Sequence, residues 1–293
     1  MTYAERASSF DCQGQRLQAI FCVPGQAARR GILIVVGGAQ YRVGSHRQFV
    51  LMARYFAGCG MAVMRFDYRG MGDSAGAPRD YDALHDDLHA AIDHFVAERP
   101  EVGELVLLGL CDGASAIALY GASDPRVSAL VLLNPWVHNE ARAASAMLRH
   151  YYARRVLSPQ FWRKLARAEL QPGAALRALF DTVKANWMQA RKQRSAAAPG
   201  RDGTTGRTVP GPCVAERVRT GLQQFTGPVL IVLGAEDATG REFAAVAAGR
   251  DWRPLRARPG WRSDVVAGAD HTFSRRQWRE QACALVQSWS ASW

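Results

Sequence analysis

Apolar runs of strand length alternate with segments of helical periodicity along most of this chain. A continuous apolar run suits a strand buried on both faces, as in a parallel sheet, and an apolar stripe repeating every three to four residues suits a helix packed on a sheet. The expected strands are an opening hairpin and a series of apolar runs: 7–23, 31–36, 61–66, 106–110, 127–133, 228–234 and a last short one just before residue 271. The expected helices are 49–58, 81–97, 115–122 and a final one that includes Trp278 and Trp289. The alternation predicts an α/β fold with a doubly wound, mostly parallel sheet.

The alternation is interrupted once, after residue 137. Residues 138–222 contain helical stretches but no apolar strand, and residues 195–212 have the small and polar composition of a flexible linker. The strand pattern then resumes. A chain of 293 residues is long enough for one large α/β domain with an insertion. We therefore expect a core of residues 1–137 and 223–293, interrupted by a helical lid at 138–222.

One expected strand leads directly into a turn flanked by glycines, Gly109-Leu110-Cys111-Asp112-Gly113, and a small-residue segment of helical character follows. In such a strand–turn–helix the residue at the tip is held in a strained backbone conformation above the sheet edge. The flanking positions must be small, because strand and helix pass close to each other. Gly109 and Gly113 meet this requirement, so the turn resembles a nucleophile elbow with cysteine at its tip. By itself the pentapeptide also fits a cysteine beside ordinary turn glycines.

Two further candidate side chains follow later strands. Asp237 comes directly after the strand at 228–234, and His271 follows the last short strand. Because the carboxyl ends of parallel strands meet at one edge of the sheet, we expect both residues near Cys111, in the chain order nucleophile, acid, base. His271 would accept the thiol proton or hold a thiolate–imidazolium pair, and Asp237 would accept a hydrogen bond from the other ring nitrogen.

Other acids remain candidates for the same role. Glu236 precedes Asp237, and Asp270 precedes His271. Because Asp270 is adjacent to the base in sequence, we expect its side chain to point elsewhere.

The attacked carbonyl also needs backbone N–H donors. We expect one from Asp112, directly after the nucleophile, and the second from the loop after Gly37-Gly38, with Ala39 or a neighbour as donor.

These motifs together resemble those of α/β-hydrolases over nearly the full chain. They are Gly37-Gly38, the loop Asp67 to Ser74, the elbow, Gly234 to Asp237, and Asp270-His271. More narrowly, the run from Gly37 to Phe49, with Cys-Asp-Gly at the elbow, is similar to the exosortase A system-associated hydrolase 1 family. That resemblance implies a link to bacterial exopolysaccharide biosynthesis and exosortase-dependent protein sorting, and implies no particular substrate. The chain departs from the commoner hydrolase pattern in having Gly-Gly for His-Gly and cysteine for serine.

The cysteine determines which reactions are expected. A cysteine nucleophile forms a thioester, which is activated toward amines and thiols as well as water. The leading hypothesis is an acyl hydrolase that acts on an ester or thioester through Cys111, His271 and Asp237. The second is an acyltransferase that uses the same cysteine, and the third is a non-catalytic protein that binds a ligand or partner through this fold. Cysteine elbows also occur in dienelactone-hydrolase-like enzymes, which the chain resembles only at the elbow.

The net charge of +11 is concentrated in the expected lid. Residues 140–222 contain 16 Lys and Arg against 5 Asp and Glu, and the remaining residues balance. This excess fits solvated helix faces, or an anionic substrate such as coenzyme A, an acyl carrier protein or an acidic glycan. Trp136, Trp162 and Trp187 are candidates for an acyl pocket or for packing within the lid. We expect no nucleic acid as partner, because no binding motif or aromatic stacking platform accompanies the charge.

Cysteine and histidine spacing indicates no metal centre, no cofactor and no disulfide framework. The six cysteines are far apart, and no signal segment or bilayer-spanning run is seen. His85 and His89 fall four residues apart on one helix, with His94 beyond them, but acids surround them and a third ligand is missing. We expect a solvated face there and a cytoplasmic protein. The oligomeric state does not follow from the sequence.

Overall fold

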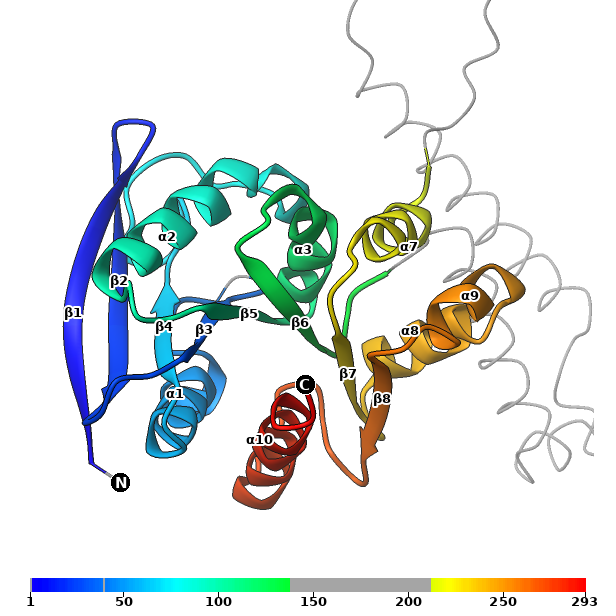
Figure 1. Ribbon diagram of the computed structural model, residues 1–293. Coiled ribbons are helices and arrows are strands. Elements are labelled where there is room, and N and C mark those ends of the chain that lie inside the picture. Colours follow the sequence, from blue (N-terminus) through cyan, green and yellow to red (C-terminus); the bar gives the residue numbers. More distant parts are fainter. Residues whose placement is uncertain (1, 39, 138–211) are drawn as a thin grey trace, which may run out of the picture. The chain divides into compact units, whose positions relative to one another are not determined.

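The computed structural model describes residues 2–38, 40–137 and 212–293, which form one compact unit. Its centre is an eight-stranded sheet with helices on both faces (Figure 1). The other residues, 1, 39 and 138–211, lie outside this description. The predicted lid helices and the linker at 195–212 therefore stay predictions.

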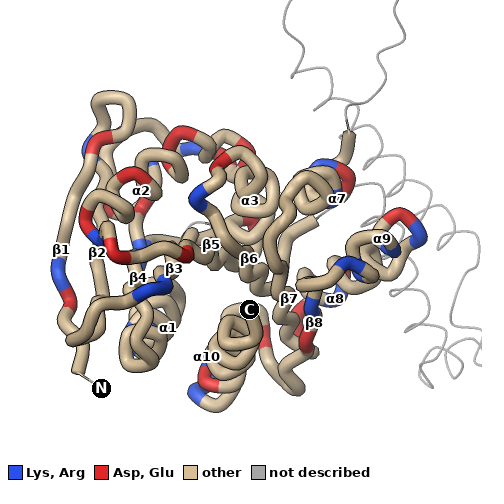
Figure 2. The backbone as a smooth tube through the Cα atoms, viewed as in Figure 1, with Lys and Arg blue, Asp and Glu red and all other residues tan. Residues whose placement is uncertain are grey.

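The sheet confirms the predicted topology. Its first two strands are the opening hairpin, which pairs antiparallel with the third strand of the sheet, and every later pair is parallel. The order across the sheet is β1 (Tyr3–Cys12), β2 (Gln15–Pro24), β4 (Ala62–Phe66), β3 (Arg30–Val35), β5 (Glu104–Leu110), β6 (Val127–Leu133), β7 (Val229–Gly234) and β8 (Trp261–Val266). Strands β6 and β7 contain no charged residue (Figure 2), as expected for strands covered on both faces.

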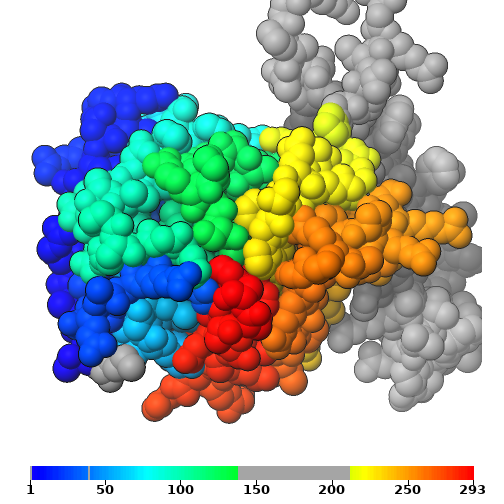
Figure 3. All heavy atoms as spheres, viewed as in Figure 1, coloured from blue at the N-terminus to red at the C-terminus, as the bar shows by residue number. Residues whose placement is uncertain are grey.

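Helices bury each face of this sheet. On one face lie α1 (Gln48–Gly58) and α10 (Arg276–Ser290). On the other lie α2 (His85–Glu98), α3 (Asp112–Tyr120), α7 (Val214–Gln224), α8 (Ala238–Ala247) and α9 (Arg253–Arg256). Strand side chains alternate between the two apolar clusters: Ile32 and Ile34 point to the first face, Leu33 and Val35 to the second. The C-terminal helix α10 packs against α1 and β8 (Figure 3).

Helix α7 corrects one predicted boundary. Residues 214–222 are predicted to belong to the lid, but α7 packs against α3 and belongs to the same compact unit as the sheet. Its side chains Val218 and Leu222 are fully buried in the core. The predicted lid ends where the strand pattern resumes, and a segment without an apolar strand gives no sign of the layer against which it packs. Of the helices that the structure describes, none has the length and apolar character needed to span a bilayer.

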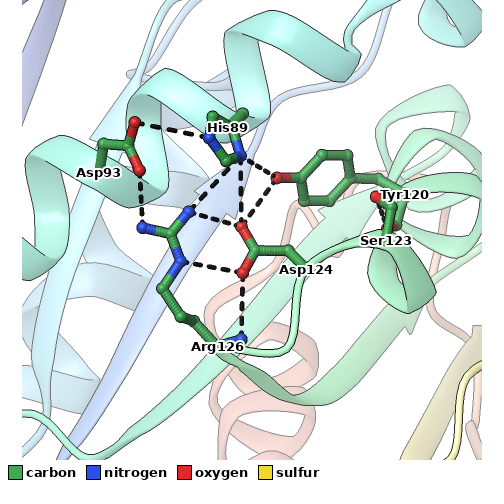
Figure 4. Close-up of polar contacts among 6 residues, drawn as sticks. All are labelled: His89, Asp93, Tyr120, Ser123, Asp124 and Arg126. Atoms are coloured by element: carbon green, nitrogen blue, oxygen red, sulfur yellow. Dashed lines mark hydrogen bonds and ion pairs between the residues drawn. The ribbon is translucent and has the colours of Figure 1, made fainter.

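His89, on the helix face that was expected to be solvated, belongs to a charged cluster between α2 and the start of β6 (Figure 4). Asp124, buried just before β6, accepts hydrogen bonds from Arg126 Nε and Nη2, at 2.9 and 2.7 Å, and from the Tyr120 hydroxyl at 3.0 Å. His89 Nδ1 lies 3.3 Å from that hydroxyl, and Arg126 Nη1 donates to Asp93 at 2.6 Å. The cluster therefore holds α2 against the start of β6.

The other two histidines also have structural partners. His94 stacks on Phe10 with ring centroids 4.9 Å apart, and one of its ring nitrogens lies 2.7 Å from the Ser8 hydroxyl. His85 packs edge-on against Tyr120. The expected solvated face is therefore wrong for His94, which covers the sheet edge. Among the described residues, no group of three or more His, Cys, Asp or Glu side chains is placed to hold a metal ion.

Asp124 gives a prediction about acid stability. Burial raises its pKa, but the hydrogen bonds from Arg126 and Tyr120 outweigh burial and lower it to about 2. A carboxyl with a lowered pKa stabilises the folded state above its unfolded pKa and loses this contribution as the pH falls through its folded pKa. We expect Asp124→Asn to reduce the free energy of unfolding by about 2 kcal/mol at neutral pH. In urea titrations, the gap between variant and wild type should close between about pH 4 and pH 2. A gap that persists at the acid end would contradict this origin.

Candidate active site

Cys111 stands at the tip of a turn between β5 and α3. Its φ of 60° and ψ of −124° are rare for a residue with a side chain and mark a strained backbone. The turn is held by its own backbone: Cys111 N–H donates to the Leu133 carbonyl at 3.0 Å, and its carbonyl accepts from Trp136 N–H at 3.1 Å. The side chain is half-buried. The strand–turn–helix context expected of an elbow is therefore present.

The flanking glycines are required by close backbone contacts. A Cβ at Gly109 would lie 2.5 Å from the Gly113 carbonyl oxygen, and a Cβ at Gly113 would lie 2.7 Å from the Val35 carbonyl oxygen. Both distances are too short for any side chain. Ordinary turn glycines would not need this packing, because both contacts follow from the tight passage of α3 over β5 and β3.

The structure brings His271 between Asp237 and Cys111. His271 Nδ1 lies 3.0 Å from Asp237 Oδ1, and the ring also contacts the Cys111 side chain. The Asp237 carboxylate and, after it, the Cys111 sulfur favour the protonated ring and raise the pKa of His271 to about 10, against the effect of burial.

Asp237 is fixed by the helix that it caps. Its carboxylate accepts hydrogen bonds from Gly240 N–H at 2.7 Å and Thr239 N–H at 3.3 Å at the start of α8. Burial raises the pKa of the Asp237 carboxyl. The hydrogen bonds from His271 and Gly240 N–H lower it by more, so this pKa lies below its ordinary value. Asp237 is therefore a charged, oriented partner for the imidazole.

The two alternative acids face elsewhere. Asp270 accepts hydrogen bonds from Ser274 N–H, at 2.9 Å, and from Thr272 N–H, at 3.2 Å, within its own loop. The Glu236 side chain is exposed and lies 3.7 Å from Arg241. Of the three acids that the sequence left open, the structure places Asp237 beside His271.

The predicted oxyanion donors are only partly described. The N–H of Asp112 lies at the first turn of α3, whereas Ala39 is outside the described residues and stays a prediction. The Asp112 side chain was not anticipated: its Oδ1 accepts from the N–H groups of Gly38 and Gly113 and also lies near its own N–H. Burial raises the pKa of this carboxyl, against those donors. An oxyanion would compete with it for the Asp112 N–H.

The loop that carries Ala39 is anchored by the motif at 67–74. Asp67 is fully buried and accepts from Arg42 N–H at 2.5 Å, from the Arg42 guanidinium, and from Asp73 N–H at 3.1 Å. Arg42 Nη2 also donates to Asp73 at 2.6 Å. Asp67 is therefore a structural residue that ties this loop to the end of β4.

Two residues near the site were found only in the structure. One is the Asp112 carboxyl, and the other is Asn134, whose side chain joins the loops that carry the acid and the base. A polar residue at the end of an apolar strand is the sequence signal that could have drawn attention to Asn134. Of the three tryptophans proposed for an acyl pocket, only Trp136 is described, and it packs edge-on against Tyr81 with centroids 5.2 Å apart.

Comparison with known proteins agrees with the fold. Residues 27–248 match the family described as serine aminopeptidase, S33. Similar solved structures include an esterase of Pyrococcus furiosus (TM-score 0.63, 16% identity, 99% of this chain and 93% of that chain). Another is Est1E of Butyrivibrio proteoclasticus with ferulic acid bound (TM-score 0.60, 18% identity, 97% and 98%). A third is a serine hydrolase without a lid from Xanthomonas campestris (TM-score 0.58, 16% identity, 99% and 94%). At these identities the structures show the α/β-hydrolase fold. The comparison with curated proteins finds no match.

Proposed function

Because the chain belongs to the serine aminopeptidase S33 family, with an α/β-hydrolase fold, we propose that it is an acyl hydrolase with cysteine in place of the nucleophilic serine. The observation that carries the proposal is the position of His271, which contacts both the Cys111 side chain and the Asp237 carboxylate. A nucleophile, a base and an orienting acid in this arrangement form the unit needed for covalent acyl transfer.

The reaction follows from these positions. His271 accepts the thiol proton, and the partial positive charge at the start of α3 favours the resulting negative sulfur. The Cys111 thiolate attacks the carbonyl carbon, and the carbonyl π electrons move to the oxygen, which accepts a hydrogen bond from Asp112 N–H after displacing the Asp112 carboxyl. Collapse of this intermediate expels an alkoxide or thiolate, which takes the proton from His271 and leaves a thioester on Cys111. His271 then takes a proton from water, whose oxygen attacks the thioester carbonyl. Collapse of this second intermediate breaks the C–S bond and releases the acid, and the Cys111 sulfur takes the proton back from His271.

The proposed site limits the identity of the substrate less than it limits the type of reaction. One of the similar proteins named above is an esterase, which favours an ester as substrate, and a thioester follows from the cysteine. Acyl transfer to an amine or thiol would use the same intermediate. An anionic carrier facing residues 140–222, a link to exopolysaccharide and exosortase systems, and a cytoplasmic location remain predictions from the sequence.

The test measures the reactivity of Cys111 directly. We expect iodoacetamide to alkylate Cys111 at about pH 6.5 at least tenfold faster than an ordinary thiol, as followed by mass spectrometry. His271→Ala should remove this advantage, while His85→Ala, a change at the exposed face of α2, should not. Turnover of p-nitrophenyl acetate and acetyl-coenzyme A should fall by about 100-fold or more in His271→Ala.

Other cysteines of the chain provide the reference rates. Burial raises the pKa of Cys12 and Cys22 to about 11 and that of Cys283 to about 12, so these thiols should stay unlabelled in the folded protein. Cys59 is half-buried like Cys111, and burial raises its pKa too. If Cys111 reacts no faster than Cys59 and no substrate is turned over, the enzyme proposal is wrong and a non-catalytic binding protein becomes the better reading.

A further inference from the structure

Asn134 occupies a special position at the end of β6. Its side chain is completely buried. Its φ of 42° lies in the left-handed region, which asparagine tolerates better than most residues with a side chain. Its N–H donates to the Val232 carbonyl at 3.0 Å, so the backbone is still paired with β7. The side chain therefore leaves the strand end in a direction fixed by the backbone.

The amide of this side chain makes one hydrogen bond to each of two loops. Nδ2 donates to the His271 carbonyl at 2.9 Å, and Oδ1 accepts from Gly234 N–H at 2.8 Å. His271 is the base, and Gly234 ends the strand that leads to Asp237. A Cβ at Gly240 would lie 2.7 Å from Asn134 Oδ1 and 3.3 Å from Asp237 Oδ2, so this glycine gives the amide room beside the carboxylate.

We propose that Asn134 is a positioning residue that fixes the loop carrying His271 relative to the loop carrying Asp237, so that His271 stays against Asp237. The inference rests on the proposed function, because it assigns Asn134 to the same site. The two bonds require a donor and an acceptor at the end of one short side chain. Asparagine supplies both, whereas aspartate in its charged form supplies only acceptors and a leucine supplies neither.

The other hydrogen bonds between these two loops explain why the Asn134 side chain is needed. Backbone bonds also join the two loops, from Ala235 N–H to the Val266 carbonyl at 3.1 Å and from Glu236 N–H to the Ala269 carbonyl at 2.9 Å. These bonds end before residue 271, so the Asn134 amide is the contact that reaches the carbonyl of the base itself. Errors of about 1 Å in such an arrangement can cost about 100-fold in rate.

The test uses two substitutions at Asn134 and a matched control on the same strand. Asn134→Gly accepts the positive φ and removes both bonds. Asn134→Asp keeps the acceptor for Gly234 N–H but turns an oxygen toward the His271 carbonyl. The control is Ser128→Ala at the opposite end of β6, where the Ser128 hydroxyl accepts from Leu105 N–H at 3.2 Å.

We expect both Asn134 variants to lower kcat for p-nitrophenyl acetate by about tenfold or more while KM changes less than about twofold. The pH profile of Cys111 alkylation should shift toward that of His271→Ala. Ser128→Ala should lower the melting temperature without moving either readout. If the Asn134 variants lose only thermal stability, as Ser128→Ala does, and keep the wild-type kcat and pH profile, the proposal is overturned.

A second measurement separates this proposal from the proposed function. The His271 ring is titrated by NMR in a Cys111→Ala background, with and without Asn134→Gly. A fall of about half a pH unit or more in the His271 midpoint supports the positioning role, because the ring has lost part of its contact with Asp237. An unchanged midpoint overturns it. This readout needs no reactive thiol, so it decides about Asn134 even if Cys111 proves inert.

Discussion

Replacing Asp237 by asparagine is expected to lower kcat by about 100-fold to 10,000-fold while the fold stays intact. Asparagine is as good an N-cap as aspartate, because its amide oxygen can still accept from Gly240 N–H at the start of α8, although its NH2 group cannot accept the second bond from Thr239 N–H. The charge beside His271 Nδ1 is lost, however, and with it the main cause of the raised pKa of the ring. An imidazole that is less basic and free to adopt the other tautomer accepts the thiol proton poorly.

The two other acids provide the controls for this prediction. Asp270→Asn should change kcat by no more than a few-fold, because its carboxyl is bonded within its own loop. Glu236→Gln should be silent, since this side chain is exposed. Steady-state kinetics with melting curves for all three variants makes the comparison. Equal losses for Asp270→Asn and Asp237→Asn would mean that the acid has been assigned wrongly.

The second large effect is expected from Gly37→Ala, which should prevent folding or cost more than about 4 kcal/mol of stability. The added Cβ would lie 2.1 Å from the Leu110 carbonyl oxygen and 2.9 Å from Gly113 N, and both are backbone atoms of the elbow. Neither strand β5 nor helix α3 can move aside without disturbing the sheet. Soluble yield and the urea midpoint report the loss.

The adjacent glycine separates crowding from backbone strain. At Gly38 a Cβ would meet nothing within 4 Å, but φ is +64°. Gly38→Ala should therefore cost only about 1–2 kcal/mol, the strain of a left-handed conformation. A third variant, Gly58→Ala, has open space and no positive φ, and should be nearly neutral. Equal stability of Gly37→Ala and Gly38→Ala would contradict the close contact between Gly37 and the turn at Cys111.

The fold could be predicted because its signal is local and repeated. Each apolar run, such as 127–133, reports a strand buried on both faces, and the strict order of strands and helices leaves few topologies. The site could be predicted to the level of strand ends, because parallel strands bring Cys111, Asp237 and His271 to the same edge. The roles of these three residues stay predictions until the reactivity of the thiol is measured.

What the sequence could not provide depends on the path of the backbone between elements. The choice among Glu236, Asp237 and Asp270 depends on the turn geometry that aims each side chain, which no periodicity encodes. The Asn134 side chain bonds to residues that lie 100 and 137 positions away along the chain. No local pattern in the sequence indicates such distant partners. The same holds for the Asp112 carboxyl, whose donor Gly38 lies 74 positions away.

The insertion leaves the core at Trp136 and returns to it at α7, and both points are anchored. Trp136 N–H bonds to the Cys111 carbonyl, its own carbonyl accepts from the Ser115 hydroxyl, and α7 packs on α3. Both attachment points of residues 138–211 are therefore held by contacts with the core. The proposed nucleophile, acid and base all come from the core, so we expect a change in the length or sequence of residues 138–211 to alter which acyl donors are accepted without changing the residues that carry out the reaction.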